Sequence, residues 1–440
     1  MFKKLEAQGL IANYNRVRKN LPPKLPERVF VWDETLKEGV QTPTVFLTYV
    51  EKVKLAKLLD EIGVSQITVG FPAFSDEEKN SIRRIANEGF QQATIVASAR
   101  ANRSDIDACL ECGIREIAVY SPFNGLNLQY NLKITREQAL QKTVESIVYA
   151  KKRSVTVDFV LEDASRTPIE EILQIFEAAS KAGASRLVIA DTVGFLRPLS
   201  MRYLISHVRE GLEQALGKDT PLSVHCHNDF GLATANTLAA VEEGVNNVHT
   251  CVSGFGERAG VTPLEEVVTA LELLYNIDTG LDLKSLYRLS QLTEKAFALP
   301  VQFHKPIIGE NAFSYESDAQ IQAILANPII YEPFPPEIVG REAVFFFGRQ
   351  TGKSLIENRL QSGGIKATPM QVGEIVRRIK RMQESSDKGE AQMTFYQIKK
   401  LMRDLRKGLT DEEFWKIVEQ VTRQKPKLPL LSGDRESESP

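Results

Sequence analysis

The 440-residue chain is poor in cysteine, histidine and tryptophan, with four, five and two of them respectively. So few cysteines in a chain of this length argue against a disulfide framework and indicate a reducing compartment. No apolar run approaches the roughly 18 residues that a membrane span requires. The N-terminal stretch lacks the apolar core of a secretory signal. We therefore expect a cytoplasmic protein with no membrane partner.

The chain also lacks an excess of either charge, because 55 lysines and arginines face 57 aspartates and glutamates, for a net charge of −2. This balance offers nucleic acid no general electrostatic attraction, so we expect no nucleic-acid partner. No glycine-rich dinucleotide turn or phosphate-binding loop follows the first predicted strand, which argues against an open nucleotide-binding sheet. The partners that remain to be considered are small molecules.

What the sequence does contain is a regular alternation of short β-branched apolar runs with longer amphipathic stretches. The apolar runs are Val29–Asp33, Gln66–Val69, Thr94–Ala97, Glu116–Val119, Val155–Val160, Arg186–Ala190, Leu222–His227 and Asn247–Thr250. Such alternation predicts parallel βαβ units. Because these units fill about 250 residues, they favour an α/β fold of the closed (β/α)₈ TIM-barrel type over an open sheet.

The pattern also suggests where the chain divides. We place the barrel at residues 28–280, after an N-terminal helical extension at 1–27. Proline-rich sequence within 281–345 indicates a linker subdomain, and helical periodicity indicates a mainly helical C-terminal subdomain at 346–424. The polar tail at 425–440 is predicted to be disordered. We expect the parts after the barrel to pack on a second copy, giving a homodimer.

The strongest local signal is a pair of histidines, His225 and His227, at the end of the seventh predicted strand. Residues two apart in a strand share a face, and active sites of such barrels lie at the C-terminal strand ends. Glu38 follows the first strand, which lies two places from the seventh in a closed barrel. These residues predict a site for a divalent ion, Zn²⁺, Mn²⁺ or Mg²⁺. A hydrogen-bonded histidine pair without metal is the alternative.

Other strand ends carry polar groups at the same predicted rim. Glu162 follows the fifth strand and Thr192 the sixth, although the acidic residues beside them could equally cap helices. Lys37, beside Glu38, could place a positive charge where an enolate develops. The glycine-rich segment at 254–260 could bind an anionic group or could simply form a tight corner, and the sequence leaves that choice open.

The chain resembles the acyl-CoA condensing enzymes of the isopropylmalate, homocitrate and citramalate synthase family, within the group that includes hydroxymethylglutaryl-CoA lyase. The likeness is carried by D-E-T-L-K-E-G-V-Q at 33–41, H-C-H-N-D at 225–229 and G-E-R-A-G at 256–260. The resemblance implies a transferase of amino-acid biosynthesis that joins an acyl-CoA, with acetyl-CoA as the expected donor, to a 2-oxo acid. It assigns metal binding to Glu38, His225 and His227, substrate binding to Gln41, Arg100 and Thr192, and catalysis to Glu162 and Tyr331.

The chain departs from the pattern of that family at several positions, among them Ala118 in place of a histidine on the fourth strand, and three departures bear directly on the metal and on proton transfer. Lys37 stands in place of an arginine, Val261 in place of an asparagine, and Gln320 in place of the acid–base histidine. Glutamine does not titrate, so proton transfer must fall to other groups.

We therefore assign the role of base to Glu162 and that of proton donor to Tyr331 or Tyr315. Two alternatives stay open at this point. One is a carbon–carbon lyase or aldolase on the same metal barrel, in which Lys37 could form a Schiff base. The other is a ligand-binding relative that has lost catalysis.

Overall fold

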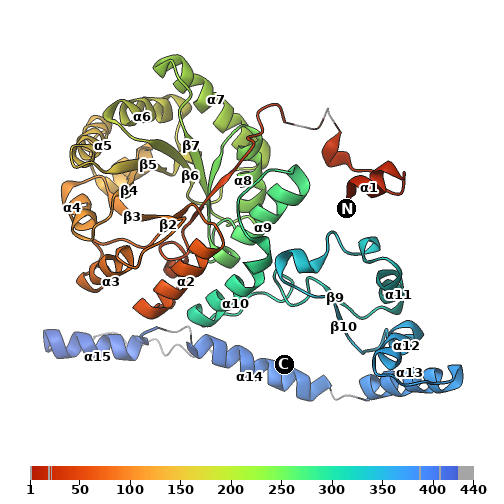
Figure 1. The fold of residues 1–440 in the computed structure, drawn as a ribbon. Coiled ribbons are helices and arrows are strands. Elements are labelled where there is room, and N and C mark those ends of the chain that lie inside the picture. The colour runs from red at the N-terminus through yellow and green to blue at the C-terminus, as the bar shows by residue number, and fades with distance from the viewer. Residues whose placement is uncertain (1, 18–19, 21, 386–387, 406–407, 425–440) are drawn as a thin grey trace.

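A computed structural model describes residues 2–17, 20, 22–385, 388–405 and 408–424 (Figure 1). Its centre is a closed barrel of parallel strands that neighbour one another in chain order, β1 to β8. The strands are Phe30–Asp33, Gln66–Thr68, Thr94–Arg100, Glu116–Pro122, Thr156–Glu162, Arg186–Asp191, Leu222–Cys226 and Asn247–Thr250. The predicted barrel is thus confirmed, and the third, fourth and fifth strands run two or three residues further toward the rim than predicted.

Helices cover the outside of the barrel (Figure 1). They are α2 Tyr49–Glu61, α3 Asp76–Ala86, α4 Arg103–Glu111, α5 Arg136–Lys151, α6 Ile169–Ala182, α7 Pro198–Leu216, α8 Ala233–Glu242, α9 Leu264–Ala270 and α10 Leu286–Phe297. Several begin at a capping side chain; Thr48 and Thr135, for example, each form a capping box. The main core lies between these helices and the outer strand faces, where valine, leucine and isoleucine are fully buried.

Closure of the barrel brings distant parts of the chain to one rim. Strand β1 pairs with β8 over its whole length, and β8 pairs with β7. The loop after β1 is tied to the loop after β8, because the backbone N–H of Val252 donates to Thr35 Oγ1 at 2.9 Å. The chain around Glu38 is therefore held beside the histidine-bearing end of β7.

The parts outside the barrel differ from the predicted division. Of the predicted helical extension at 1–27, the described residues form only helix α1, Phe2–Ala7, and one short turn at Tyr14–Arg16. Strands β9, Ser314–Tyr315, and β10, Val344–Phe345, pair with each other, and the carboxylate of Asp318 accepts a hydrogen bond from Leu355 N–H. The predicted boundary at 345/346 therefore crosses a packed unit.

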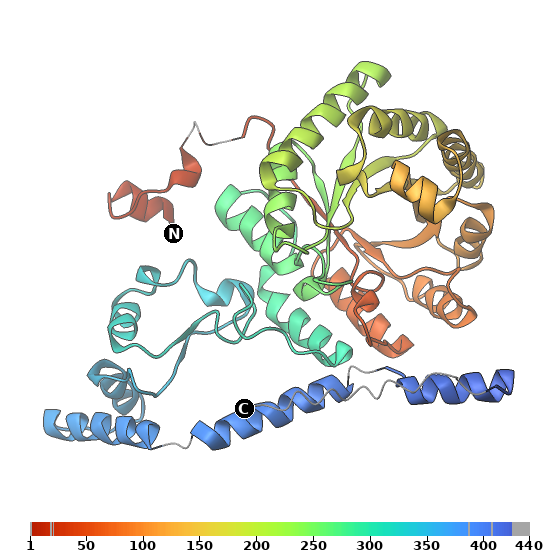
Figure 2. The ribbon, with the colours of Figure 1, turned by 180° about the vertical axis from the view of Figure 1, so that it is seen from behind.

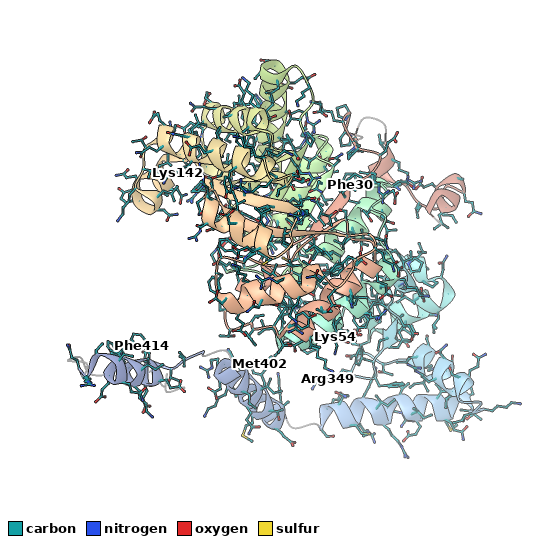
Figure 3. The ribbon with its side chains drawn as sticks, turned by 60° about the vertical axis from the view of Figure 1, so that its left-hand side comes forward. Phe30, Lys54, Lys142, Arg349, Met402 and Phe414 are labelled. Carbon is teal, nitrogen blue, oxygen red and sulfur yellow. The ribbon has the colours of Figure 1, made fainter. Side chains whose placement is uncertain are left out.

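The remaining helices follow this unit. They are α11 Asp318–Ala326, α12 Lys353–Ser362, α13 Pro369–Glu384, α14 Lys388–Leu405 and α15 Asp411–Thr422. Helices α14 and α15 run past the barrel without packing on it (Figures 1 and 2). Met402 and Phe414, on these two helices, are labelled in Figure 3. The tail predicted to be disordered lies outside the described residues.

All four cysteines are free and buried, so they form no disulfide framework. Among the described residues, none of the helices has the length and apolar content needed to cross a membrane.

Candidate metal centre and substrate cavity

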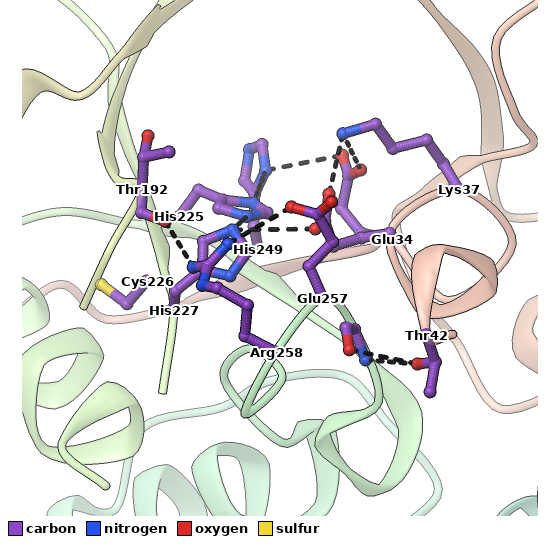
Figure 4. Close-up of polar contacts among 12 residues, drawn as sticks. Glu34, Lys37, Thr42, Thr192, His225, Cys226, His227, His249, Glu257 and Arg258 are labelled. Atoms are coloured by element: carbon purple, nitrogen blue, oxygen red, sulfur yellow. Dashed lines mark hydrogen bonds and ion pairs between the residues drawn. The ribbon is translucent and has the colours of Figure 1, made fainter. Parts of the chain in front are cut away.

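Two histidines face each other at the C-terminal end of β7. His225 is the fourth residue of the strand, and His227 lies just beyond it, where its backbone N–H donates to the carbonyl of Asp191 at 3.2 Å. Their Nε2 atoms are 3.4 Å apart, and both side chains are buried. The end of β7 therefore aims two lone-pair donors at one point (Figure 4).

A carboxylate completes this group. Glu38, 3% exposed, places Oε1 3.7 Å from His227 Nε2. One ligand atom from each of Glu38, His225 and His227 lies within 4.8 Å of the other two. Ligands held at about 2.1 Å from one ion lie roughly 3–4 Å apart, so this spacing is close to what a shared divalent ion requires.

The protonation states of the three side chains also suit a metal. Burial, aided by the neighbouring His227, lowers the pKa of His225 to about 3, and burial also lowers the pKa of His227. Burial alone would raise the pKa of Glu38, but Lys37 and the two histidines lower it to about 2. Neutral imidazoles and an ionised carboxylate are the forms in which these side chains bind divalent ions. The donor set therefore fits the predicted ion.

Lys37 lies at the edge of this group as a paired cation. Its Nζ is 2.9 Å from Glu38 Oε2 and 3.9 Å from Glu34 Oε2, and it stands 4.6 Å from the centre of the Tyr120 ring. Burial alone would lower the pKa of Lys37, but Glu38, Tyr120 and Glu34 raise it well above its usual value. Lys37 is thus an ammonium group at neutral pH, which supplies charge but not a nucleophilic amine.

A deeper layer of side chains, not predicted from the sequence, supports the histidines. His249 on β8 places Nδ1 3.4 Å from Nδ1 of His225 and 3.6 Å from Oε1 of Glu34 (Figure 4). Glu34 Oε1 also accepts a hydrogen bond from Thr68 at 2.8 Å. The signal was available, because His249 stands on the strand beside His225, but it required the register between the two strands.

A cavity of about 240 Å³ opens beside the three metal-ligand candidates. The predicted residues Lys37, Gln41, Arg100, Glu162 and Thr192 all line it, together with Phe71, Ser98, Ala99, Tyr120, Val160, Ala190 and Glu257. A larger cavity of about 560 Å³ adjoins it and shares Arg100, Tyr120 and Glu162 with it. The two cavities meet where β3, β4 and β5 end.

Glu162 and Arg100 differ in how they are held at this junction. Burial raises the pKa of Glu162 above its ordinary value of 4.5. Arg100 is fixed by Asp105, whose carboxylate accepts hydrogen bonds from its Nε at 2.7 Å and its Nη2 at 3.1 Å. Glu162 is therefore placed as a base with raised basicity, while the guanidinium of Arg100 is partly neutralised.

The acidic residues next to Glu162 and Thr192 have structural roles. Asp163 accepts two hydrogen bonds from Arg166, and Asp191 accepts the backbone N–H groups of Phe195 and Leu196 at 2.8 and 3.1 Å. Only Glu162 and Thr192 of these two pairs face the cavity. Asp163 makes no capping hydrogen bond at the short turn after it, and Asp191 holds the loop before α7, so the predicted helix-capping alternative does not apply.

The glycine-rich segment at 254–260 forms a tight corner. A Cβ at Gly260 would lie 1.9 Å from the Gly254 carbonyl oxygen, so this close approach requires glycine. Arg258 donates to Asp229 at 2.8 Å and 3.0 Å and to the carbonyl of Thr192 at 2.7 Å. The segment thus joins the loops after β6, β7 and β8.

The structure does not bring the two predicted proton donors to the cavity of their own chain. Within the described residues, neither Tyr315 nor Tyr331 lines it. Tyr315 belongs to β9 and packs against Phe345, and Tyr331 is half exposed after a short turn at Pro328–Ile330. A part for either tyrosine would require its approach from another chain.

Two regions of the chain match known family models. Residues 28–293 match the HMGL-like family model, and residues 307–387 match the model described as homocitrate synthase post-HMGL domain-like. The first match contains the whole barrel and every residue around the candidate metal centre. The second contains Tyr315 and Tyr331.

Curated relatives match most of the chain. Homocitrate synthase AksA of Methanothermobacter thermautotrophicus is 39% identical over 86% of this chain and 95% of its own. A probable 2-isopropylmalate synthase of Ignicoccus hospitalis is 42% identical over 81% of this chain and 88% of its own. Among solved structures, the HMG-CoA lyase of Bacillus subtilis has a TM-score of 0.56 at 21% identity and covers 63% of this chain and 96% of its own. That likeness concerns the fold alone.

Proposed function

The chain belongs to the HMGL-like family, and we propose that it condenses an acyl-CoA, acetyl-CoA being the expected donor, with a 2-oxo acid. The homocitrate and 2-isopropylmalate synthases named among its relatives support this class of reaction. Their names differ in the oxo acid they imply, so the family alone leaves that substrate open.

The observation that carries the proposal is the position of Glu162. Its side chain lines both the cavity beside Glu38, His225 and His227 and the larger adjoining cavity. A condensing enzyme needs a base between its two substrates. The adjoining cavity is also lined by Arg103 and Lys142, whose charges suit the phosphates of coenzyme A. We therefore place the oxo acid on the metal side and the acyl-CoA on the other.

The residues around the metal side divide the chemical work. A divalent ion held by Glu38, His225 and His227 would supply Lewis acidity toward the ketone of the oxo acid. Lys37 keeps a positive charge beside the carbon–oxygen bond where negative charge develops. Thr192 and Gln41 offer hydrogen bonds that orient the oxo acid.

Glu162 then removes a proton from the carbon next to the thioester. The resulting carbon nucleophile attacks the ketone carbon, the ketone oxygen takes up a proton, and water cleaves the thioester to release the coenzyme A thiol. Burial raises the pKa of Glu162, which strengthens it as a base. Burial also raises the pKa of Tyr315, so its phenol keeps its proton at neutral pH.

We further propose that the protein is a cytoplasmic homodimer in which helices α14 and α15 contact the second copy. Their described residues expose large apolar side chains, among them Phe395 at 59%, Leu401 at 62% and Val421 at 78%. Burying such side chains contributes roughly 1.5–3 kcal/mol each. Sedimentation velocity of the full chain should give the mass of a dimer, and a monomer at micromolar concentration would contradict this.

The two alternatives have less support. A Schiff-base aldolase needs a neutral amine, whereas Lys37 is ion-paired. The curated relatives at 39% and 42% identity are named as synthases rather than lyases. A protein that had lost catalysis would have no need to keep Glu162 buried beside the metal donors.

A thiol-release assay tests the proposed function. Metal-loaded protein is mixed with acetyl-CoA and each member of a panel of 2-oxo acids, and free thiol is followed. We expect release that depends on one oxo acid and stops when a chelator removes the metal. Thiol release that is the same with and without an oxo acid would indicate a thioesterase. If the protein cleaves a hydroxyacyl-CoA but condenses acetyl-CoA with none of the oxo acids, the result would favour the lyase.

A further inference from the structure

Lys305 joins the barrel to the chain that follows it. It lies in the loop between α10 and β9, and its Nζ is 2.7 Å from Glu266 Oε1 and 3.8 Å from Glu265 Oε1. Both glutamates belong to the first turn of α9. The side chains of Lys305 and Glu266 are 13% and 17% exposed, and that of Glu265 is 2% exposed. This cluster is therefore shielded from the water and salt that weaken ion pairs at a protein surface.

The same two glutamates also hold two loops at the rim of the barrel. Glu265 Oε2 accepts the backbone N–H of Ser253 at 3.0 Å, in the short turn after β8. Glu266 Oε2 accepts the hydroxyl of Thr234 at 2.6 Å, in the first turn of α8, the helix after β7. Four residues beyond Ser253, Glu257 lines the metal-side cavity. The first turn of α9 thus connects Lys305 to the chain after β7 and to the chain after β8.

On its other side, Lys305 is connected to the unit formed by β9 and β10. The backbone N–H groups of Gly309 and Asn311 donate to the carbonyls of Lys305 and Phe303 at 3.0 and 2.7 Å. A Cβ at Gly309 would lie 2.6 Å from the backbone N and O atoms of Lys305, so this close fold requires glycine. Arg341, which is buried just before β10, donates to the Gly309 carbonyl at 3.0 Å. The loop therefore links Lys305 closely to the β9–β10 unit.

Glu265 depends on the charge of Lys305. Burial raises the pKa of Glu265 to about 7, while Lys305 lowers it and Glu266 raises it. Within the described residues, Oε1 of Glu265 is buried and has no hydrogen-bond partner, so the nearby ammonium group compensates its charge. Without Lys305, Glu265 would take up a proton more readily. Its hydrogen bond from Ser253 would then weaken, because an ionised acceptor bonds more strongly than a neutral one.

We propose that Lys305 is a positioning residue that couples the β9–β10 unit to the rim loops after β7 and β8, and so to the metal-side cavity. This inference rests on the proposed function, because its kinetic consequence requires the condensation to occur at that cavity. Lys305 is not among the described residues that line either cavity, so it acts through Glu265 and Glu266. A misplacement of about 1 Å that arises far from the reacting atoms can slow a reaction roughly a hundredfold.

The variant Lys305→Met removes the charge and keeps an unbranched side chain. Thiol release is measured on metal-loaded protein with acetyl-CoA and the oxo acid of the panel that releases thiol fastest. We expect kcat to fall at least about tenfold, while the KM for the oxo acid and the metal content stay unchanged. Lys305→Arg keeps the charge and should retain most of the native kcat. Lys57 supplies the matched control, because its Nζ also lies 2.7 Å from a glutamate, Glu88, and Lys57→Met should leave kcat unchanged.

Hydrogen–deuterium exchange gives a readout that a general loss of stability would not imitate. In Lys305→Met, the backbone amides at 251–260 and 302–311 should lose protection together. Helix α5, which follows the strand opposite β8 in the barrel, should keep its native protection. Native kcat in Lys305→Met, or faster exchange at 302–311 with 251–260 unchanged, would overturn the inference.

Two further outcomes are also decided by these measurements. If Lys305→Met does not fold, Glu266→Gln takes its place, because it removes one charge of the cluster and keeps an oxygen that accepts hydrogen bonds; the same kinetic and exchange results then support or overturn the coupling. If the native protein releases no thiol with any oxo acid, the proposed function fails. The exchange measurement then decides the coupling alone, since joint loss of protection supports it and separate behaviour of the two segments overturns it.

Discussion

Replacing His225 or His227 by alanine should strip the divalent ion from the protein. The two Nε2 atoms lie 3.4 Å apart, and each replacement leaves two of the three protein donors. We expect elemental analysis of metal-loaded protein to fall from about one ion per chain to near zero. Turnover should fall at least about a thousandfold, because Lewis-acid polarisation of the ketone is worth several kcal/mol.

A surface histidine supplies the matched control for this experiment. His207 on α7 is exposed and bonds only locally, with Ser206 and the Tyr203 carbonyl, so His207→Ala should keep both metal and activity. Thermal melting then separates metal loss from unfolding. A full complement of metal in both His225→Ala and His227→Ala would exclude the proposed ligand set.

The barrel and the grouping of Glu38, His225 and His227 could be predicted because both depend on short-range patterns. Strand β7 shows this well, since Leu222–Cys226 is a short, fully buried stretch that ends beside His227. Residues two apart on a strand share a face whatever the rest of the chain does. The position of Glu38 near these histidines then follows from the strand order, because β1 lies two places from β7 in the closed barrel.

Features that depend on contacts between distant residues were beyond prediction. The carboxylate of Glu34 meets His249 only because β1 and β8 pair in one particular register. Similarly, Asp318 binds Leu355 N–H across the predicted boundary at 345/346. The salt bridge from Arg100 to Asp105 is local in sequence, but it depends on the turn from β3 into α4, and it gives a partner to a residue that the resemblance assigned to substrate binding.

The site residues fall between these two cases. Alternation along β5 places Glu162 at the rim, but its raised pKa comes from burial, which a linear sequence does not display. Tyr315 and Tyr331 were chosen by resemblance, and the described chain keeps them out of its own cavity. Their role therefore stays a prediction that depends on the second copy.

The replacement Glu162→Gln should lower kcat by roughly a hundredfold to ten-thousandfold, the range typical of losing a general base. The amide keeps the size of the side chain but accepts no proton. Because the lost interaction belongs to the transition state, the KM for the oxo acid should change little. The surface replacement Glu177→Gln, on α6 and away from the site, should leave both parameters unchanged.

The pH profile provides a second readout that a purely structural effect would not imitate. Glu162 acts as a base only when ionised, and burial raises its pKa above the ordinary value of 4.5. Activity of the native protein should therefore rise with pH through that raised pKa and fall away below it. In Glu162→Gln the residual rate should lack this acid limb, because the titrating group is gone. Full activity in the variant, or an unchanged acid limb at reduced rate, would assign proton abstraction to another residue.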